Sequence, residues 1–209
     1  MYIIHIVIAK LFLLLESLYN YLNNIETNYM NRIKAVCIMQ GKCDGYIELE
    51  EYGKKRVKLT LNISNLDPYS IHAFHIHETG DMRNGCMSLK AHYNPHNKNH
   101  GGLDDKDRHV GDFGNIVADK DGNVKQTFMS DLVKLKGKTS VIGRSFVIHE
   151  GVDDLGKGGN EESLKTGNAG ARIGCGVIGY AENSKLYFYY LHLNHLYHLN
   201  YLINIQYLV

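Results

Sequence analysis

Short runs of alternating apolar and polar residues, separated by glycine-rich turns, restrict the fold of this chain more than any other feature. This two-residue period is typical of β-strands with one buried face, and no long run in the middle of the chain shows a convincing helical period. Candidate strands cover residues 33–39, 45–52, 56–63, 71–77, 112–119, 123–130, 140–149 and 171–181. The stretch "DKDGN" at 119–123 is a strong hairpin turn. Eight short strands with long loops at 78–111 and 150–170 predict a β-sandwich or barrel that carries its chemistry on loops.

Glycine and proline mark out the part of the chain that folds in this way. All 21 glycines and both prolines lie between residues 30 and 181, whereas the two ends hold 10 of the 15 tyrosines. This distribution predicts a globular domain over 30–181, an apolar extension over 1–29 and a Tyr/Leu/Asn-rich tail over 182–209. The formal net charge is only +1, so the overall charge gives no reason to expect a nucleic-acid partner.

The N-terminal extension, "MYIIHIVIAKLFLLLESLYNYLNN", allows several interpretations. It could be a signal peptide or membrane anchor, although no basic residue precedes the apolar run, Lys10 interrupts it and no small-residue cleavage site follows. Alternatively, Met30 is the true start and the upstream residues belong to an over-extended reading frame. We expect a cytoplasmic protein, with the secretory pathway or the cell exterior as the alternative if residues 1–29 act as a signal. Membrane contact by this segment stays open.

Histidines gather in two places along the domain. His75 and His77, in "HAFHIH", lie two residues apart, so on a strand both side chains project from one face. His149 ends a later strand candidate. The first long loop adds three imidazoles and a carboxylate, a set that suits four-coordinate zinc: His92, His100, His109 and Asp112. The sequence therefore offers two clusters of metal ligands, one on strand ends and one on a loop.

Residues Asn31 to about Ala181 resemble the copper/zinc superoxide dismutases. Four motifs carry the resemblance in the family's order: "HAFHIHETGD", "GCMSLKAHYNPHNKNHGG", "RHVGDFGNI" and "HEGVDDLGKGGNEESLKTGNAGARIGCGVIG". The resemblance implies an all-β, eight-stranded Greek-key barrel or sandwich, immunoglobulin-like, with two long functional loops. It also implies an oxidoreductase, a superoxide dismutase that converts superoxide to dioxygen and hydrogen peroxide.

The resemblance also assigns the metal ligands. It implies copper ligands His75, His77, His92 and His149, and zinc ligands His92, His100, His109 and Asp112. His92 would bridge the two ions. Copper would cycle between Cu(II) and Cu(I), whereas zinc would hold the bridging ring and tune its basicity. Asp154, in "DDLGKGG", resembles the carboxylate that orients the rings of His75 and His100.

Residues around the metal positions are assigned in the same way. Arg172 resembles the arginine that docks the anion beside copper. A charged loop, "GGNEESLKTGN", resembles the segment that guides superoxide, through Glu161, Glu162, Lys165 and Thr166. For the two glutamates an ordinary solvated loop is an equal alternative. Cys86 and Cys175 would form a disulfide by resemblance. We expect Cys37 to be buried and Cys43, in a turn, to be exposed.

Partners and rival functions complete the expectations. The resemblance implies superoxide as substrate, a homodimer built on the last strand and nearby loops, and a copper chaperone as a further partner. One rival is a copper-handling metallochaperone, but the chain has no CxxC motif. The other is a catalytically inactive dismutase-like decoy, which would require a missing ligand or a lost arginine. All seven ligand positions and Arg172 are filled, so the enzyme is favoured.

Overall fold

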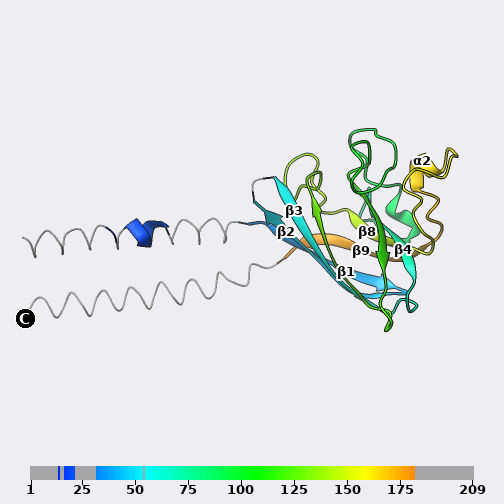
Figure 1. The fold of residues 1–209 in the computed structure, drawn as a ribbon, viewed down its shortest axis with the longest axis horizontal. Helices are drawn as coiled ribbons and strands as arrows, with labels where there is room; N and C mark the ends of the chain where they lie inside the picture. Colours follow the sequence, from blue (N-terminus) through cyan, green and yellow to red (C-terminus); the bar gives the residue numbers. More distant parts are fainter. Residues whose placement is uncertain (1–13, 15–16, 22–31, 54, 182–209) are drawn as a thin grey trace, which may run out of the picture. The chain divides into compact units, whose positions relative to one another are not determined.

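The expected strands form an antiparallel sheet that wraps into a nearly closed barrel in the computed structural model (Figure 1). The structure describes residues 14, 17–21, 32–53 and 55–181. Within this part of the chain, Ile33–Ala181 forms one compact unit that contains all the strands. Leu14 and residues 17–21 are helical, and no described helix is long and apolar enough to cross a membrane. The remaining expectations for the extension and the tail concern residues outside those described.

Eight strands make up the barrel, and three short elements lie in its loops. The barrel strands are β1 (Lys34–Gly41), β2 (Asp44–Tyr52), β3 (Arg56–Ser64), β4 (Ile71–His77), β6 (Asp112–Val117), β7 (Val124–Ser130), β8 (Ser145–His149) and β9 (Arg172–Tyr180). The loop elements are β5 (Arg83–Cys86), the 3₁₀ helix η1 (Met87–Leu89) and the helix α2 (Ser163–Thr166). The prediction of an eight-stranded all-β fold is confirmed.

The order of the strands produces the Greek-key arrangement. Neighbouring strands follow the order β6-β4-β8-β9-β1-β2-β3-β7, and the edge strands β6 and β7 contact each other. Consecutive strands β3 and β4 are not neighbours, and neither are β7 and β8, so the chain crosses the barrel twice. This crossing brings β4 and β8 together, and these are the two strands that carry predicted copper ligands.

Alternating side chains fill the barrel interior. On β3, Val57, Leu59, Leu61 and Ile63 are all buried, while the residues between them are half-exposed. Phenylalanine rings complete the core and include a stacked pair, Phe74 and Phe146, with ring centroids 5.0 Å apart. Burial of these apolar side chains stabilises the barrel that supports the metal ligands.

Strand β8 is shorter than predicted. The expected strand at 140–149 is wrong for its first five residues, because Gly143 has a φ of 79° and the amide of Arg144 donates to the carbonyl of Val141. These features make a turn rather than a strand. The strand therefore begins at Ser145.

Four cysteines lie near β9. Cys86 and Cys175 form a disulfide that ties the first long loop to β9 across 89 residues, as predicted. Cys37 is buried, as expected. The expectation that Cys43 is exposed is wrong, because its Sγ fills the space beside Gly174, where a Cβ would clash with it.

Candidate metal centre

Strands β4 and β8 position the first histidine cluster. His75 and His77 project from one face of β4, and β4 pairs with β8, which ends at His149. A bridge between His77 and His92 brings the first long loop against β4. One ligand atom from each of these four buried residues lies within 4.8 Å of the others. The Nε2 atoms of His77 and His149 are 3.2 Å apart.

Three imidazoles surround one carboxylate oxygen in the second cluster. The Oδ1 atom of Asp112 lies 3.0 Å from Nδ1 of His92, 3.0 Å from Nδ1 of His100 and 3.1 Å from Nδ1 of His109. The other oxygen accepts backbone hydrogen bonds from Gly101 at 3.1 Å and His109 at 2.8 Å. Three nitrogens and one oxygen that converge in this way form the donor set of a tetrahedral zinc site.

The two clusters adjoin at His92. Its ring centroid lies 3.9 Å from that of His75 and 5.5 Å from that of His109. His75 is also within reach of Asp112 and His100. Its Nε2 bonds elsewhere, however, so its free Nδ1 belongs with the first cluster.

Buried ring nitrogens without hydrogen-bond partners provide the test of metal binding. Among the described residues, Nδ1 of His75 and Nε2 of His92 are buried and accept or donate no hydrogen bond, and Nδ1 of His100 is buried with only Oδ1 of Asp112 beside it, 3.0 Å away. Burying an unpaired polar atom is costly, and neutral imidazole nitrogens are good ligands for copper and zinc. The residues present therefore fit both metals.

Asp153 orients two of these rings, which corrects the prediction for Asp154. The Oδ2 of Asp153 lies 2.8 Å from Nε2 of His75, and its Oδ1 lies 2.7 Å from Nε2 of His100. Each ring is thereby turned so that its Nδ1 faces a cluster. Asp154 points away and accepts hydrogen bonds from Ser163 at 2.7 Å and Asn168 at 2.6 Å. Its role is to hold the second long loop.

Burial controls the protonation of the first cluster. It lowers the pKa of His75 and His77 well below the ordinary value, and neighbouring His92 adds to the effect. Burial also lowers the pKa of His149 to about 4. Burial alone would raise the pKa of Asp112, but hydrogen bonds with His100 and His109 lower it below its ordinary value. These neutral rings and this carboxylate are the protonation states that bind metal ions.

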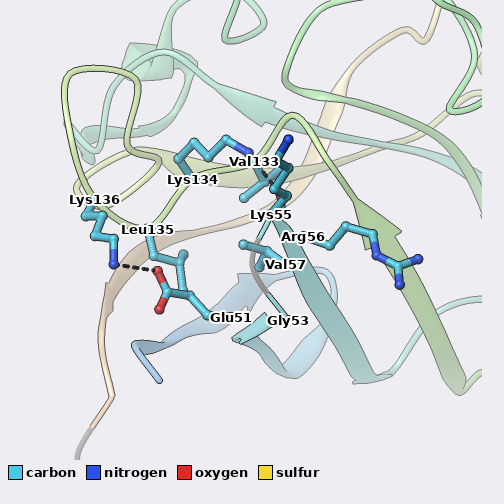
Figure 2. A pocket seen from close by; sticks show the side chains of 9 residues that line it. All are labelled: Glu51, Gly53, Lys55, Arg56, Val57, Val133, Lys134, Leu135 and Lys136. Atoms are coloured by element: carbon cyan, nitrogen blue, oxygen red, sulfur yellow. Dashed lines mark hydrogen bonds and ion pairs between the residues drawn. The ribbon is translucent and has the colours of Figure 1, made fainter. Parts of the chain in front are cut away.

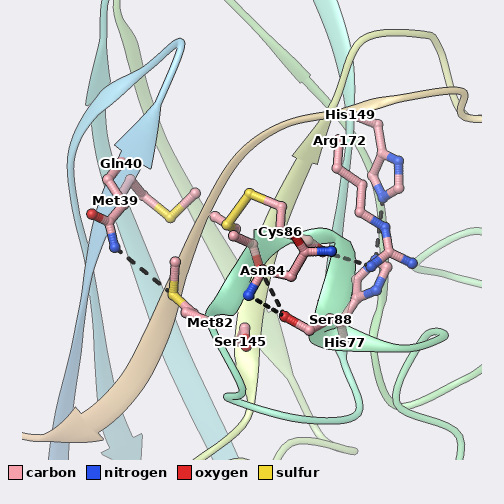
Figure 3. Close-up of a disulfide and its surroundings, with 12 residues drawn as sticks. Met39, Gln40, His77, Met82, Asn84, Cys86, Ser88, Ser145, His149 and Arg172 are labelled. Atoms are coloured by element: carbon pink, nitrogen blue, oxygen red, sulfur yellow. Dashed lines mark hydrogen bonds between the residues drawn. A yellow bond between two sulfur atoms is a disulfide. The ribbon is translucent and has the colours of Figure 1, made fainter.

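Arg172 lies beside the first cluster at the start of β9. Figure 3 shows its guanidinium next to His77 and His149, close to the disulfide. It donates to the carbonyl of Cys86 at 2.7 Å and also to the carbonyl of Lys90. A cavity of about 370 Å³ opens here, and its lining includes Arg172, His77, His92, His149, Glu162 and Thr166. A small anion entering this cavity meets a fixed positive charge.

The charged loop contributes unequally to this cavity. Glu162 and Thr166 line it, and Thr166 donates to the Glu162 carboxylate at 2.8 Å. Glu161 and Lys165 do not line it and instead form an exposed ion pair at 2.6 Å. The structure thus brings two of the four predicted guidance residues to the cavity and leaves the other two on the outer surface.

Backbone carbonyls near the site accept hydrogen bonds that were not predicted from the sequence. The Lys90 carbonyl accepts from Nδ1 of His77 at 2.8 Å and from Arg172, and the Gly170 carbonyl accepts from Nδ1 of His149 at 3.1 Å. Lys90 itself has a φ of 61° and a ψ of −151°. Because every residue has a carbonyl, no sequence signal could have identified these acceptors.

Comparisons with known proteins agree with this geometry. A sequence model of copper/zinc superoxide dismutase (SODC) matches residues 43–178. The Cu-Zn superoxide dismutase of Paramecium bursaria Chlorella virus 1 is 49% identical over 162 residues, covering 78% of this chain and 86% of the viral protein. That of Pleurocordyceps sinensis is 53% identical over 152 residues, covering 71% and 99%. The crystal structure of the clock protein EA4 has a TM-score of 0.68 and 39% identity, covering 71% of this chain and 94% of that chain. With this match over most of its length, the chain belongs to the copper/zinc superoxide dismutase family.

Proposed function

We propose that this protein converts two superoxide anions and two protons into one dioxygen and one hydrogen peroxide at a copper–zinc site. The observation that carries the proposal is the set of buried, unpartnered ring nitrogens beside the Arg172 cavity. In this proposal copper is held by His75, His77, His92 and His149, and zinc by His92, His100, His109 and Asp112. Bound copper supplies the one-electron oxidation and reduction of superoxide, and bound zinc supplies fixed charge and structure.

Arg172 binds and orients the anion. Its guanidinium is held by two backbone carbonyls and keeps further N–H groups for a ligand in the cavity. Burial lowers the pKa of Arg172, but from an ordinary value of 12.5, so the group stays charged at neutral pH. This fixed charge favours a small monoanion over neutral molecules.

His92 is placed to hold a proton for the second superoxide. Its Nδ1 lies 3.0 Å from Asp112, so the opposite ring nitrogen, Nε2, faces the first cluster without a protein partner. A proton on Nε2 lies close to the Arg172 cavity, because His92 also lines that cavity. The second proton comes from solvent. Both protons end on the peroxide.

The inactive-decoy alternative gains no support from the structure. A decoy would lack a ligand or the arginine, whereas all seven ligand positions are buried and grouped, and Arg172 lines the cavity beside them. Elemental analysis tests the proposal directly. Protein from metal-replete expression should hold one copper and one zinc per chain and dismute superoxide in pulse radiolysis. Protein that takes up zinc but no copper after reconstitution would contradict the enzyme and favour the decoy.

We propose a homodimer through the sheet face formed by β1 and β9. Ile38 on β1 is 63% exposed, and Val177 on β9 is a second exposed apolar side chain on the outer face of these paired strands. A second copy of this chain would cover these side chains. Sedimentation equilibrium should give twice the chain mass. An Ile38→Glu variant should sediment as a monomer, and a monomeric wild type would contradict the proposal.

The domain boundaries and the compartment are also proposals. We infer that residues 30–181 suffice for the chemistry, because all assigned ligands, Arg172 and the disulfide lie within Ile33–Ala181. A fragment of residues 30–181 should bind both metals and match the full chain in turnover and thermal unfolding.

A cytoplasmic location should give a natural protein without a processed signal, which N-terminal sequencing and intact mass will check. A copper chaperone as partner and membrane contact by residues 1–29 stay predictions.

A further inference from the structure

A second cavity lies between the β2–β3 turn and the segment that follows β7 (Figure 2). It measures about 600 Å³, a size that can hold a small organic ligand. Its floor consists of buried apolar residues: Val57, Val133 and Leu135. It shares no lining residue with the Arg172 cavity, so it is a separate site on the barrel.

Basic side chains dominate the rim of this cavity. Lys55 and Arg56 come from the β2–β3 side, and Lys134 and Lys136 come from the segment after β7. Among the described residues that line the cavity, Glu51 is the only acidic one. Three lysines and one glutamate therefore line the cavity, and Arg56, whose guanidinium lies over the ring of Tyr52 at 5.7 Å from its centroid, adds a fourth positive charge beside it in a protein whose formal net charge is +1. Such a local excess concentrates anions at one place on the surface.

The single carboxylate does not neutralise the site. Glu51 accepts a hydrogen bond from the amide of Ile33 at 3.3 Å and pairs with Lys136 at 3.3 Å. Within the described part of the chain, Lys55, Arg56 and Lys134 form no ion pair. Lys55 and Lys134 are thus left for a ligand, and Arg56, which lies over the ring of Tyr52, adds unpaired positive charge beside them.

Lys134 is held in position before any ligand binds. Its ammonium donates to the carbonyls of Asp131 at 2.6 Å and Lys55 at 3.1 Å. The Lys134 carbonyl in turn accepts from the amide of Val141. An ammonium has three donors, so one N–H of Lys134 is free for an anion. This contact also fixes the β2–β3 turn against the segment after β7, which lowers the entropic cost of binding there.

We propose that this cavity binds a small molecule carrying two or more linked phosphates, such as a nucleoside polyphosphate or inorganic polyphosphate. Linked phosphates supply the dense negative charge that three unpaired cations require, and a single phosphate or carboxylate would leave much of it unmatched. The floor of the cavity is apolar, so only the basic side chains of the rim can balance the negative charge of the ligand. Superoxide dismutation does not use this site, so binding and turnover should be separable.

Isothermal titration of the full-length, metal-loaded protein tests this proposal with ATP and with tripolyphosphate. Both should bind, inorganic phosphate should bind far more weakly, and affinity should fall as salt rises. The double variant Lys55→Gln/Arg56→Gln, which changes exposed side chains, should weaken binding by about tenfold or more. Lys134→Gln, analysed separately because Lys134 holds the β2–β3 turn, should have a similar effect.

The matched control is Lys120→Gln/Lys125→Gln, which removes two charges elsewhere on the barrel. Lys120 pairs with Asp121, and Lys125 lies on β7 opposite Asn62, about 17 Å along β3 from Val57 at roughly 3.4 Å per residue. This control should bind ATP as the wild type does, and both double variants should keep wild-type turnover.

Tighter binding of ATP than of tripolyphosphate identifies a nucleotide, and equal binding identifies inorganic polyphosphate. The proposal is overturned by absence of binding, by equal losses in the two double variants, or by an oligonucleotide that binds more tightly than both ligands.

Discussion

Lys90→Gly should stabilise the protein, because Lys90 has a backbone conformation that suits glycine. Its φ of 61° and ψ of −151° lie at the edge of a region that is essentially restricted to glycine. The structure imposes this conformation because the Lys90 carbonyl accepts hydrogen bonds from both His77 and Arg172. The substitution removes the Cβ and leaves both hydrogen bonds in place.

The expected gain is a difference between one favourable and two unfavourable effects. A residue in such a conformation costs about 1–3 kcal/mol, which glycine would recover. Glycine makes the unfolded chain more flexible, which costs about 0.4–1 kcal/mol. The ion pair of Lys90 with Glu78, at 3.8 Å, is solvent-exposed and contributes roughly 0–1 kcal/mol. The free energy of unfolding should therefore rise by about 1 kcal/mol, or about 2–4 °C in Tm for a domain of this size.

Urea unfolding of the metal-free protein, with the disulfide intact, measures this change at equilibrium. Lys90→Ala is the matched control, because it removes the same charge and ion pair but keeps the Cβ. It should therefore gain no stability. Metal-loaded Lys90→Gly should also retain copper, because its carbonyl still orients His77. Equal stabilisation by alanine and glycine, or a loss of stability with glycine, would show that the backbone of Lys90 is not strained.

Three further predictions concern the metal centre and the free thiols. Arg172→Glu should keep both metals and lower superoxide turnover by at least about tenfold, measured by pulse radiolysis, because it repels the anion; wild-type turnover should also fall with salt. Asp153→Asn should weaken metal binding by about 10–100-fold in competition with a chelator, whereas Asp154→Asn should change it little. Burial raises the pKa of Cys37 to about 12 and of Cys43 to about 11, so both thiols should resist a disulfide reagent at pH 8 until the protein unfolds. Unfolded thiols ionise near pH 9 while the folded ones stay protonated, so stability should fall between about pH 9 and pH 11.

The barrel was predictable because burial and strand geometry leave a direct trace in the sequence. Alternation along β3 marks its buried face residue by residue, and its predicted bounds differ from the observed ones by one residue. The short elements β5, η1 and α2 leave no such trace, because three or four residues are too few to show a period. The first half of the predicted strand at 140–149 fails for a related reason. Its apolar residues are compatible with a strand, but Gly143 turns the chain.

The error over Asp153 and Asp154 has a different origin. The two carboxylates are neighbours with the same chemistry, and a loop does not reveal which one faces inward. The fold decides, because the amide of Asp153 donates to the side chain of Asn115 at 2.8 Å on β6. The Asn115 amide donates back to the Asp153 carbonyl at 3.0 Å. This reciprocal pair fixes Asp153 against the sheet and leaves Asp154 to the loop. Similarly, Cys43 looked exposed because its place beside Gly174 depends on a partner strand far along the chain.

The side chains of the metal site are oriented largely by backbone groups. The identity of the ligands can therefore be predicted from the sequence, but their arrangement cannot. The rings of His77 and His149 each donate to a carbonyl, and Arg172 donates to two. These acceptors survive substitution of their side chains, so the residue that provides one can change without disturbing the ring that it holds. What the site requires there is a path of the chain that brings the carbonyl to the ring, even when that path is unfavourable for the residue present. Lys90 meets that requirement in a strained conformation, and Lys90→Gly tests it.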